Sequence, residues 1–116
     1  MSNIIRHQSD ARLSRAVIHN GVVYLAGITA DNRGGKSKTQ TEEILAKIDA
    51  LLKLAGSSKS RLLSTVVYVA DMRVKPGMDE AWMAWIDPKN PPARATVETR
   101  LGTADTLVEI MVTAAQ

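Results

Sequence analysis

The apolar and polar positions near the start of the chain predict a β-hairpin. Residues 16–19 and 22–26 are rich in β-branched and other apolar side chains, and Asn20 and Gly21 lie between them. Both turn residues accept a positive φ, which a two-residue hairpin turn requires. Asn-Gly between two such segments is the strongest short hairpin signal. We therefore expect the fold to open with two paired strands.

A polar stretch rich in glycine and asparagine follows, and then the clearest helical pattern in the chain. Its apolar side chains recur at helical spacing, at Ile44, Leu45, Ile48, Leu51, Leu52 and Ala55. Thr39 and Glu42 precede this pattern at the spacing of a capping box. Gly56 is placed to end the helix in a left-handed conformation. We expect one face of this helix to pack on a sheet.

A central strand and a second helix come next. Residues 62–70 are rich in β-branched side chains and apolar on both alternating faces, which predicts a strand covered on both sides. Such cover requires a second layer or a partner chain. Pro76 favours the first turn of a helix that runs through Ile86. Trp82 and Trp85 share one face of this helix, and we expect them to pack in the core.

Two last strands complete the order ββαβαββ, which indicates an α/β fold with strands and helices over one sheet. They span residues 93–100 and 106–115, with a turn around residues 102–105 between them. A length of 116 residues fits one domain, residues 1–116, with one hydrophobic core.

The amino-acid composition limits the kinds of reaction, metal site and partner that can be expected of this protein. The absence of cysteine excludes disulfides, thiolate catalysis and a Cys-ligated zinc site, and two histidines leave little for other metals. The fifteen lysines and arginines are scattered, and the aromatics are two tryptophans and two tyrosines, so nucleic-acid binding is not expected. No apolar run approaches the length of a membrane span. We expect a cytoplasmic protein.

The segment PPARATVETRL, residues 91–101, carries the first candidate functional side chain. Arg94 stands near the start of this strand between Ala93 and Ala95, which leave room around it. A guanidinium is a planar fork of donors that can bind a carboxylate with two hydrogen bonds. Arg94 shares its strand face with Thr96. Because that face is polar, Arg94 either lines a cleft or meets water.

Glu109 is the second candidate. It interrupts the apolar run LVEIMV, with Leu107 and Met111 on its own face. A carboxylate in such a position costs free energy unless it is paired or hydrogen-bonded, so Glu109 is either half of a structural ion pair or a functional acid. If the last two strands form a hairpin centred on Thr103, Arg94 lies opposite Val112 and Glu109 projects from the other face. A bulge, or a meeting across a subunit boundary, would then have to bring the two together.

Six segments occur along the chain in this order: VVYLAG, IDALLKLAGSS, STVVYVAD, AWMAW, PPARATV and LVEIMVTA. Taken together, they resemble the Rid (reactive intermediate deaminase) or YjgF-like family, part of the endoribonuclease L-PSP superfamily. The resemblance covers nearly the whole chain, and the last two segments are the most specific. It implies a chorismate-mutase-like fold that forms a homotrimer, with an inner barrel of sheets, helices outside and clefts between neighbours.

The resemblance also implies a function, the hydrolysis of reactive enamines or imines to keto acids and ammonia without a cofactor or metal. Arg94 would bind the carboxylate of the substrate, and Glu109 would position the hydrolytic water. Gly27, Ala95 and Thr96 would help to hold the ligand. The implied partners are a small carboxylate or imino acid and further copies of this chain.

Several positions depart from the family pattern. Leu13 stands where a tyrosine is usual, Ala26 where a serine is usual, and Asp79 where an asparagine is usual. Thr96 replaces a common cysteine. A trimeric protein that binds a small carboxylate without chemistry is therefore the alternative. RNA binding or cleavage, ascribed to some relatives, finds little support in this composition.

Overall fold

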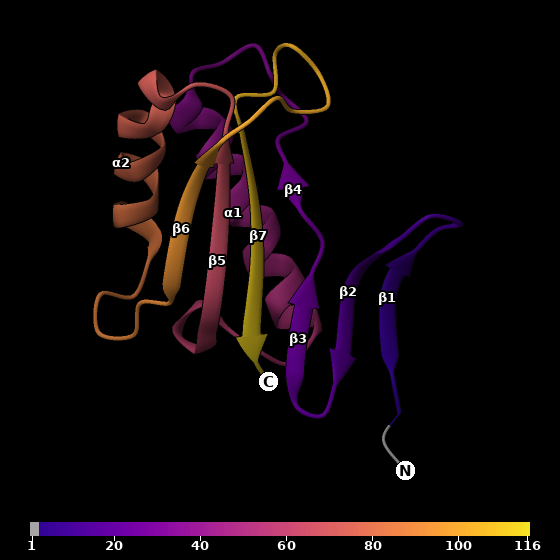
Figure 1. Cartoon of the computed structure of the whole chain (residues 1–116). Coiled ribbons are helices and arrows are strands. Elements are labelled where there is room, and N and C mark those ends of the chain that lie inside the picture. The colour runs from indigo at the N-terminus through magenta and orange to yellow at the C-terminus, as the bar shows by residue number, and fades with distance from the viewer. Residues whose placement is uncertain (1–2) are drawn as a thin grey trace.

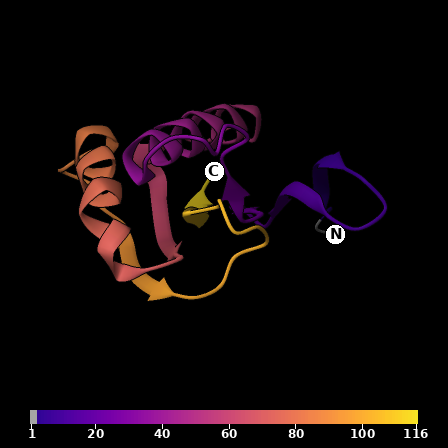
Figure 2. The same cartoon turned by 90° about the horizontal axis from the view of Figure 1, so that it is seen from above.

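The computed structural model describes residues 3–116 and shows one twisted sheet with two helices on one of its faces (Figures 1 and 2). The hydrogen-bonded order is β1-β2-β3-β7-β5-β6, and β4 also pairs with β7. The bounds are β1 (Ile5–Ser9), β2 (Ser14–His19), β3 (Val22–Leu25), β4 (Ile28–Thr29), α1 (Ser37–Leu54), β5 (Leu62–Val69), α2 (Lys75–Trp85), β6 (Ala93–Glu98) and β7 (Val108–Ala115). This confirms the predicted fold class, a mixed α and β single domain.

The predicted hairpin is present as β2 and β3. Asn20 and Gly21 have φ of 51° and 75°, as a two-residue hairpin turn requires. The sequence pattern missed β1, which pairs with β2 and forms the outer edge of the projecting arm in Figure 1. Its residues, IRHQS, have no alternating apolar face, so period-two patterning could not reveal it.

The start of α1 differs from the prediction. The helix begins at Ser37, and no side chain caps its first turn. Thr39 lies inside the helix, where its hydroxyl donates to the carbonyl of Lys36 at 2.9 Å, so the predicted capping box does not form. The other end agrees with the sequence, because Gly56 follows the helix with φ of 79°.

The last two strands do not form a hairpin, because β5 lies between them. β5 runs parallel to β6, with Thr65 beside Arg94, and antiparallel to β7, with Thr65 beside Val112. A helix connects β5 to β6, and such a crossover returns the chain in the same direction. Nearness in sequence favoured a hairpin, whereas the α2 crossover determined a parallel pair.

The hydrophobic core lies between the sheet and the two helices. Ile44 and Ile48 of α1 pack there against Val67 and Ile110 of the sheet, and all four are fully buried. Trp82 is buried and Trp85 packs against the same core, as predicted; the centres of the two rings are 5.5 Å apart. Neither helix within residues 3–116 is long and apolar enough to cross a membrane.

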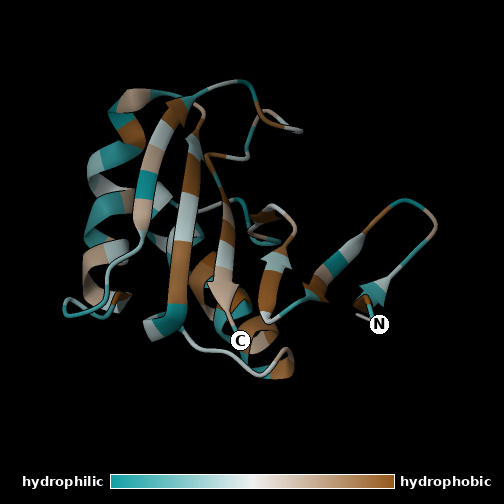
Figure 3. Cartoon of the chain, turned by 60° about the horizontal axis from the view of Figure 1, so that its bottom comes forward, coloured by the Kyte–Doolittle hydropathy of each residue, from teal (hydrophilic) through white to brown (hydrophobic). Residues whose placement is uncertain are grey.

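The opposite face of the sheet carries no helix in the described part of the chain (Figure 2). Figure 3 looks onto the sheet with the helices behind it, and β5, β6 and β7 bear both hydrophobic and polar segments. Tyr24, Val97 and Met111 on this face are 49%, 41% and 41% exposed. Within residues 3–116 the helices cover one side of residues 62–70, so the predicted cover of the other side would have to come from a partner chain.

Candidate functional site

Arg94 lies on the helix face of β6, against the middle of α2. Its Nη2 donates to Oδ1 of Asp79 at 2.8 Å. The guanidinium carbon lies 5.4 Å from the centre of the Trp82 ring, which is within the range of a cation-π interaction. Nη1 is 4.0 Å from the sulfur of Met78. The side chain is only 22% exposed, so α2 holds the guanidinium in place at the edge of the core.

Asp79 connects Arg94 to a second cation. Its Oδ2 accepts a hydrogen bond of 2.6 Å from Nζ of Lys75, one turn earlier on α2. Partial burial by itself would raise the pKa of Asp79, but the hydrogen bonds from Lys75 and Arg94 outweigh it and hold the pKa below its ordinary value of 3.8. Asp79 is therefore ionised at neutral pH. We call Lys75, Asp79, Trp82 and Arg94 the arginine cluster.

Glu109 lies on the uncovered face of the sheet. It stands beside Tyr68 of β5 and Thr29 of β4. Its carboxylate lies against Gly27, where an added Cβ would collide with Oε2 of Glu109. Within residues 3–116 no cation lies at ion-pair distance from Glu109. We call Glu109 and Gly27 the glutamate cluster.

The structure does not bring Arg94 and Glu109 together within one chain. Arg94 is in register with Thr65 and Val112, both buried under the helices. Glu109 precedes Val112 by an odd number of residues on β7, so the pleat places the two on opposite faces. The prediction of opposite faces is correct, although the hairpin from which it was drawn is not.

The other three predicted residues are divided between the two clusters. Gly27 lies with Glu109, as described above. Ala95 and Thr96 follow Arg94 on β6, with Ala95 exposed and Thr96 half-buried. β6 pairs only with β5 within the described chain, so part of its backbone hydrogen-bonding groups face away from the sheet.

Sequence reasoning missed Lys75 and Asp79 as neighbours of Arg94. A signal existed, because positions 75, 79 and 82 are spaced four and three apart and therefore share one face of a helix. That spacing could not show that the shared face meets β6. Asp79 and Arg94 are fifteen positions apart in the sequence, and only the crossover from α2 to β6 brings them into contact.

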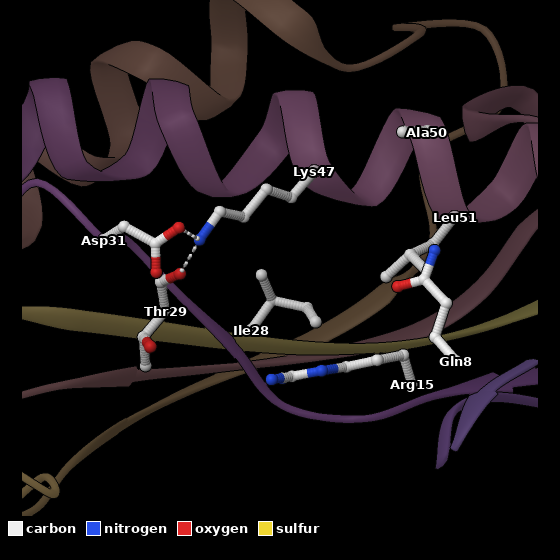
Figure 4. A pocket seen from close by; sticks show the side chains of 8 residues that line it. All are labelled: Gln8, Arg15, Ile28, Thr29, Asp31, Lys47, Ala50 and Leu51. Atoms are coloured by element: carbon white, nitrogen blue, oxygen red, sulfur yellow. Dashed lines mark hydrogen bonds and ion pairs between the residues drawn. The ribbon is translucent and has the colours of Figure 1, made fainter. Parts of the chain in front are cut away.

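A separate cavity of about 340 Å³ lies between the β1–β2 arm, β4 and α1 (Figure 4). Lys47 points across it and is 3.0 Å from Oδ2 of Asp31 and 2.8 Å from the carbonyl oxygen of Thr29. Arg15 lies at the opposite wall of the same cavity. None of the five predicted site residues lines it. It is therefore distinct from both clusters, although Thr29 neighbours Glu109 across the β4–β7 pair.

Comparison with known proteins identifies relatives along the whole chain. The profile of the family described as endoribonuclease L-PSP matches residues 4–116. A RutC family protein of Haemophilus ducreyi is 38% identical over 112 residues, which cover 97% of this chain and 96% of the relative. The RutC family protein YoaB of Escherichia coli is also 38% identical, with 97% of each chain covered. The crystal structure of a YjgF family member from Neisseria meningitidis is 38% identical and superposes with a TM-score of 0.96 over 98% of this chain and 95% of that chain.

Proposed function

This chain belongs to the endoribonuclease L-PSP family, which includes the RutC and YjgF proteins, and we propose that it hydrolyses reactive enamines or imines to keto acids and ammonia. The proposed site is a cleft between the subunits of a homotrimer in the cytoplasm. Arg94 anchors the carboxylate of the imino acid, and Glu109 of a neighbouring copy acts on the water. The reaction needs no cofactor.

The observation that carries this proposal is the position of the two charged residues on opposite faces of one sheet. A single copy cannot present Arg94 and Glu109 to the same small ligand, because the sheet itself lies between them. Two neighbouring copies can do so if the edge strand β6 of one, which pairs only with β5 within residues 3–116, lies beside the open face of the next, with the helices outside. A closed ring of such contacts gives every copy the same environment, as a cyclic oligomer requires.

The open face supports the oligomer independently. Tyr24, Val97 and Met111 expose large apolar side chains on the same side of the sheet as Glu109. Apolar residues gathered on one face often mark a protein interface. Light scattering at micromolar concentration should therefore give the mass of a trimer. A monomer mass would contradict the proposal and remove the shared site with it.

The proposed reaction requires only two functional side chains of the protein. Arg94 would bind the carboxylate, and Glu109 would accept a proton from a water molecule as its oxygen attacks the C=N carbon. The nitrogen of the resulting carbinolamine then takes up that proton and leaves as ammonia, while the hydroxyl group gives its own proton to Glu109 and becomes the C=O of the keto acid. Imines already hydrolyse in water, so positioning and one general base suffice for a modest acceleration. Glu109, with no cation at ion-pair distance in residues 3–116, is available as that base.

A trimeric protein that binds a small carboxylate without chemistry is the second candidate. Leu13 and Ala26 favour it, because the family resemblance implies hydroxyl side chains at these two positions and this chain has none there. The arginine cluster would serve a binding protein equally well. RNA cleavage, the activity in the family's name, is less favoured here because the basic residues are scattered and the aromatics are few.

One assay separates the two candidates. A panel of amino-acid-derived imines is generated in place by an amino acid oxidase, and the release of ammonia or keto acid is followed with and without the protein. The enzyme should accelerate release from at least one imine. Binding of 2-oxobutyrate together with release rates equal to the control without protein would favour the binding protein.

A further inference from the structure

Arg94 has hydrogen-bonding capacity that the chain leaves unused. A guanidinium carries several N–H donors and stays charged at any pH found in cells. Arg94 directs one of them to Asp79 at 2.8 Å, and another faces the weakly accepting sulfur of Met78 at 4.0 Å. Its remaining donors find no partner within residues 3–116. Trp82 packs beside the guanidinium and limits its movement.

The carboxylate of Asp79 can also accept further hydrogen bonds. It accepts one hydrogen bond on each oxygen, from Arg94 on Oδ1 and from Lys75 on Oδ2. An ionised carboxylate oxygen can accept more than one hydrogen bond. The Asp79 side chain is 25% exposed, so part of it remains accessible. A donor on a ligand could therefore reach Asp79 immediately beside Arg94.

The unused donors and the unused acceptor are adjacent, since Nη2 of Arg94 and Oδ1 of Asp79 are 2.8 Å apart. A ligand that carries a carboxylate and, on the next carbon, a protonated nitrogen presents the complementary pair of charges over a similarly short distance. Both contacts would be charge-assisted hydrogen bonds, which are the stronger kind. A ligand with a carboxylate alone would satisfy Arg94 and face the negative charge of Asp79.

We propose that Arg94 and Asp79 together form a receptor for a zwitterion, in which Arg94 binds the carboxylate and Asp79 accepts a hydrogen from the protonated nitrogen on the adjacent carbon. This inference rests on the proposed function and names its ligand more closely. The protonated 2-imino acid is the preferred ligand, whereas the 2-keto acid, which has lost its N–H donors, binds poorly. Asp79 thereby distinguishes the substrate from the product and favours release of the product.

The test uses two stable probes with the same carbon skeleton, 2-aminobutyrate and 2-oxobutyrate, in calorimetric titrations of the full chain. The wild type should bind the amino probe roughly tenfold more tightly, because one charge-assisted hydrogen bond separates the two. Asp79→Asn should abolish most of this preference, mainly by strengthening the binding of 2-oxobutyrate. Light scattering and circular dichroism establish that each variant keeps its assembly and fold.

The matched control is the neighbouring carboxylate, Glu80. Its side chain is 66% exposed and lies 3.3 Å from Nζ of Lys38, away from Arg94. Glu80→Gln removes the same charge from the same helix and should leave the preference intact. Loss of the preference in Glu80→Gln would show that the general charge of α2, and not the contact with Asp79, selects the ligand, and would overturn the inference.

A second variant shifts the preference in the opposite direction. Lys75→Gln removes the competing cation from Oδ2 of Asp79 and leaves the carboxylate in place. The preference for the amino probe should then increase. This measurement tests the contact between the ligand and Asp79 even if Asp79→Asn fails to fold. An unchanged or smaller preference for the amino probe in Lys75→Gln would contradict that contact.

The outcomes separate the inference from the proposed function. Equal binding of both probes to the wild type, or the same preference in wild type and Asp79→Asn, overturns the inference and leaves Arg94 as a carboxylate anchor. Equal weakening of both probes in Asp79→Asn also overturns it, because Asp79 would then only position Arg94. If neither probe binds to the wild type or to any variant, the proposed function itself falls and the inference falls with it.

Discussion

The arginine cluster and the glutamate cluster lie on the two faces of one sheet. They differ in whether other residues of the same chain compensate the charge of the central side chain. Arg94 is ion-paired to Asp79, lies beside Trp82 and is largely buried under α2. Glu109 has no cation at ion-pair distance in residues 3–116, and its carboxylate lies against Gly27 on a face without helices. On the face that the helices cover, a residue of α2 compensates the charge of Arg94. On the open face, the carboxylate of Glu109 is free to interact with a neighbouring copy, a ligand or water.

The largest effect should come from the glutamate cluster. Glu109→Gln conserves shape but cannot accept a proton, so turnover of an imine that the wild type accelerates should fall by about 10²- to 10⁴-fold. Keto-acid release measured above the uncatalysed rate checks this. Unchanged turnover would make Glu109 a structural residue. A large loss of thermal stability would instead indicate an ion pair with a neighbouring copy.

Gly27→Ala tests whether the position of the Glu109 carboxylate matters. The added methyl group would displace that carboxylate, and a displacement of this size can lower a rate by about 10²-fold. Thermal stability should change little, because the displaced group is the end of a flexible side chain. Gly102→Ala is the matched control, since a methyl group added there would meet no atom within 4 Å beyond its own chain neighbours. Turnover by Gly27→Ala equal to that of Gly102→Ala would remove Gly27 from the site.

The corresponding test of the arginine cluster is Arg94→Lys beside Arg94→Ala. Lysine keeps the charge next to Asp79 but replaces the planar fork with a point donor, so carboxylate binding should weaken by roughly ten- to a hundredfold, and alanine should weaken it further. Calorimetric titration with 2-aminobutyrate and 2-oxobutyrate measures the effect, and light scattering should show that the proposed trimer persists in both variants. Binding as tight as in the wild type would leave Arg94 only a structural role, as the ion-pair partner of Asp79.

The smallest effect concerns stability in acid. The pKa of Asp79 is lower in the folded chain than its ordinary value of 3.8, so its ion pairs stabilise the fold above that value and lose this contribution as pH falls through the folded-state pKa. Wild type should therefore be more stable than Asp79→Asn near neutral pH, by less than about 1 kcal/mol because the pair is partly exposed to solvent. Thermal unfolding at several pH values should show the difference shrinking in acid. A constant difference would assign it to packing.

The sequence by itself determined the elements whose causes are local. Asn20 and Gly21 predict the β2–β3 hairpin, and Gly56 predicts the end of α1, because each depends on the conformational freedom of one or two residues. Pro76 and the apolar spacing predict α2 in the same way. The sequence pattern also singled out Arg94 and Glu109, and the family resemblance implied their roles, without showing what lies next to either side chain.

Only the tertiary structure decided which residues meet. The α2 crossover places β6 parallel to β5, which puts Arg94 beside Thr65 and under Asp79. β7 enters on the other side of β5 and turns Glu109 to the open face. Neither outcome follows from local patterns, because strand order and register depend on where a long connection returns the chain. The local sequence decides which side chains a strand presents, and the path of the connections decides what faces them.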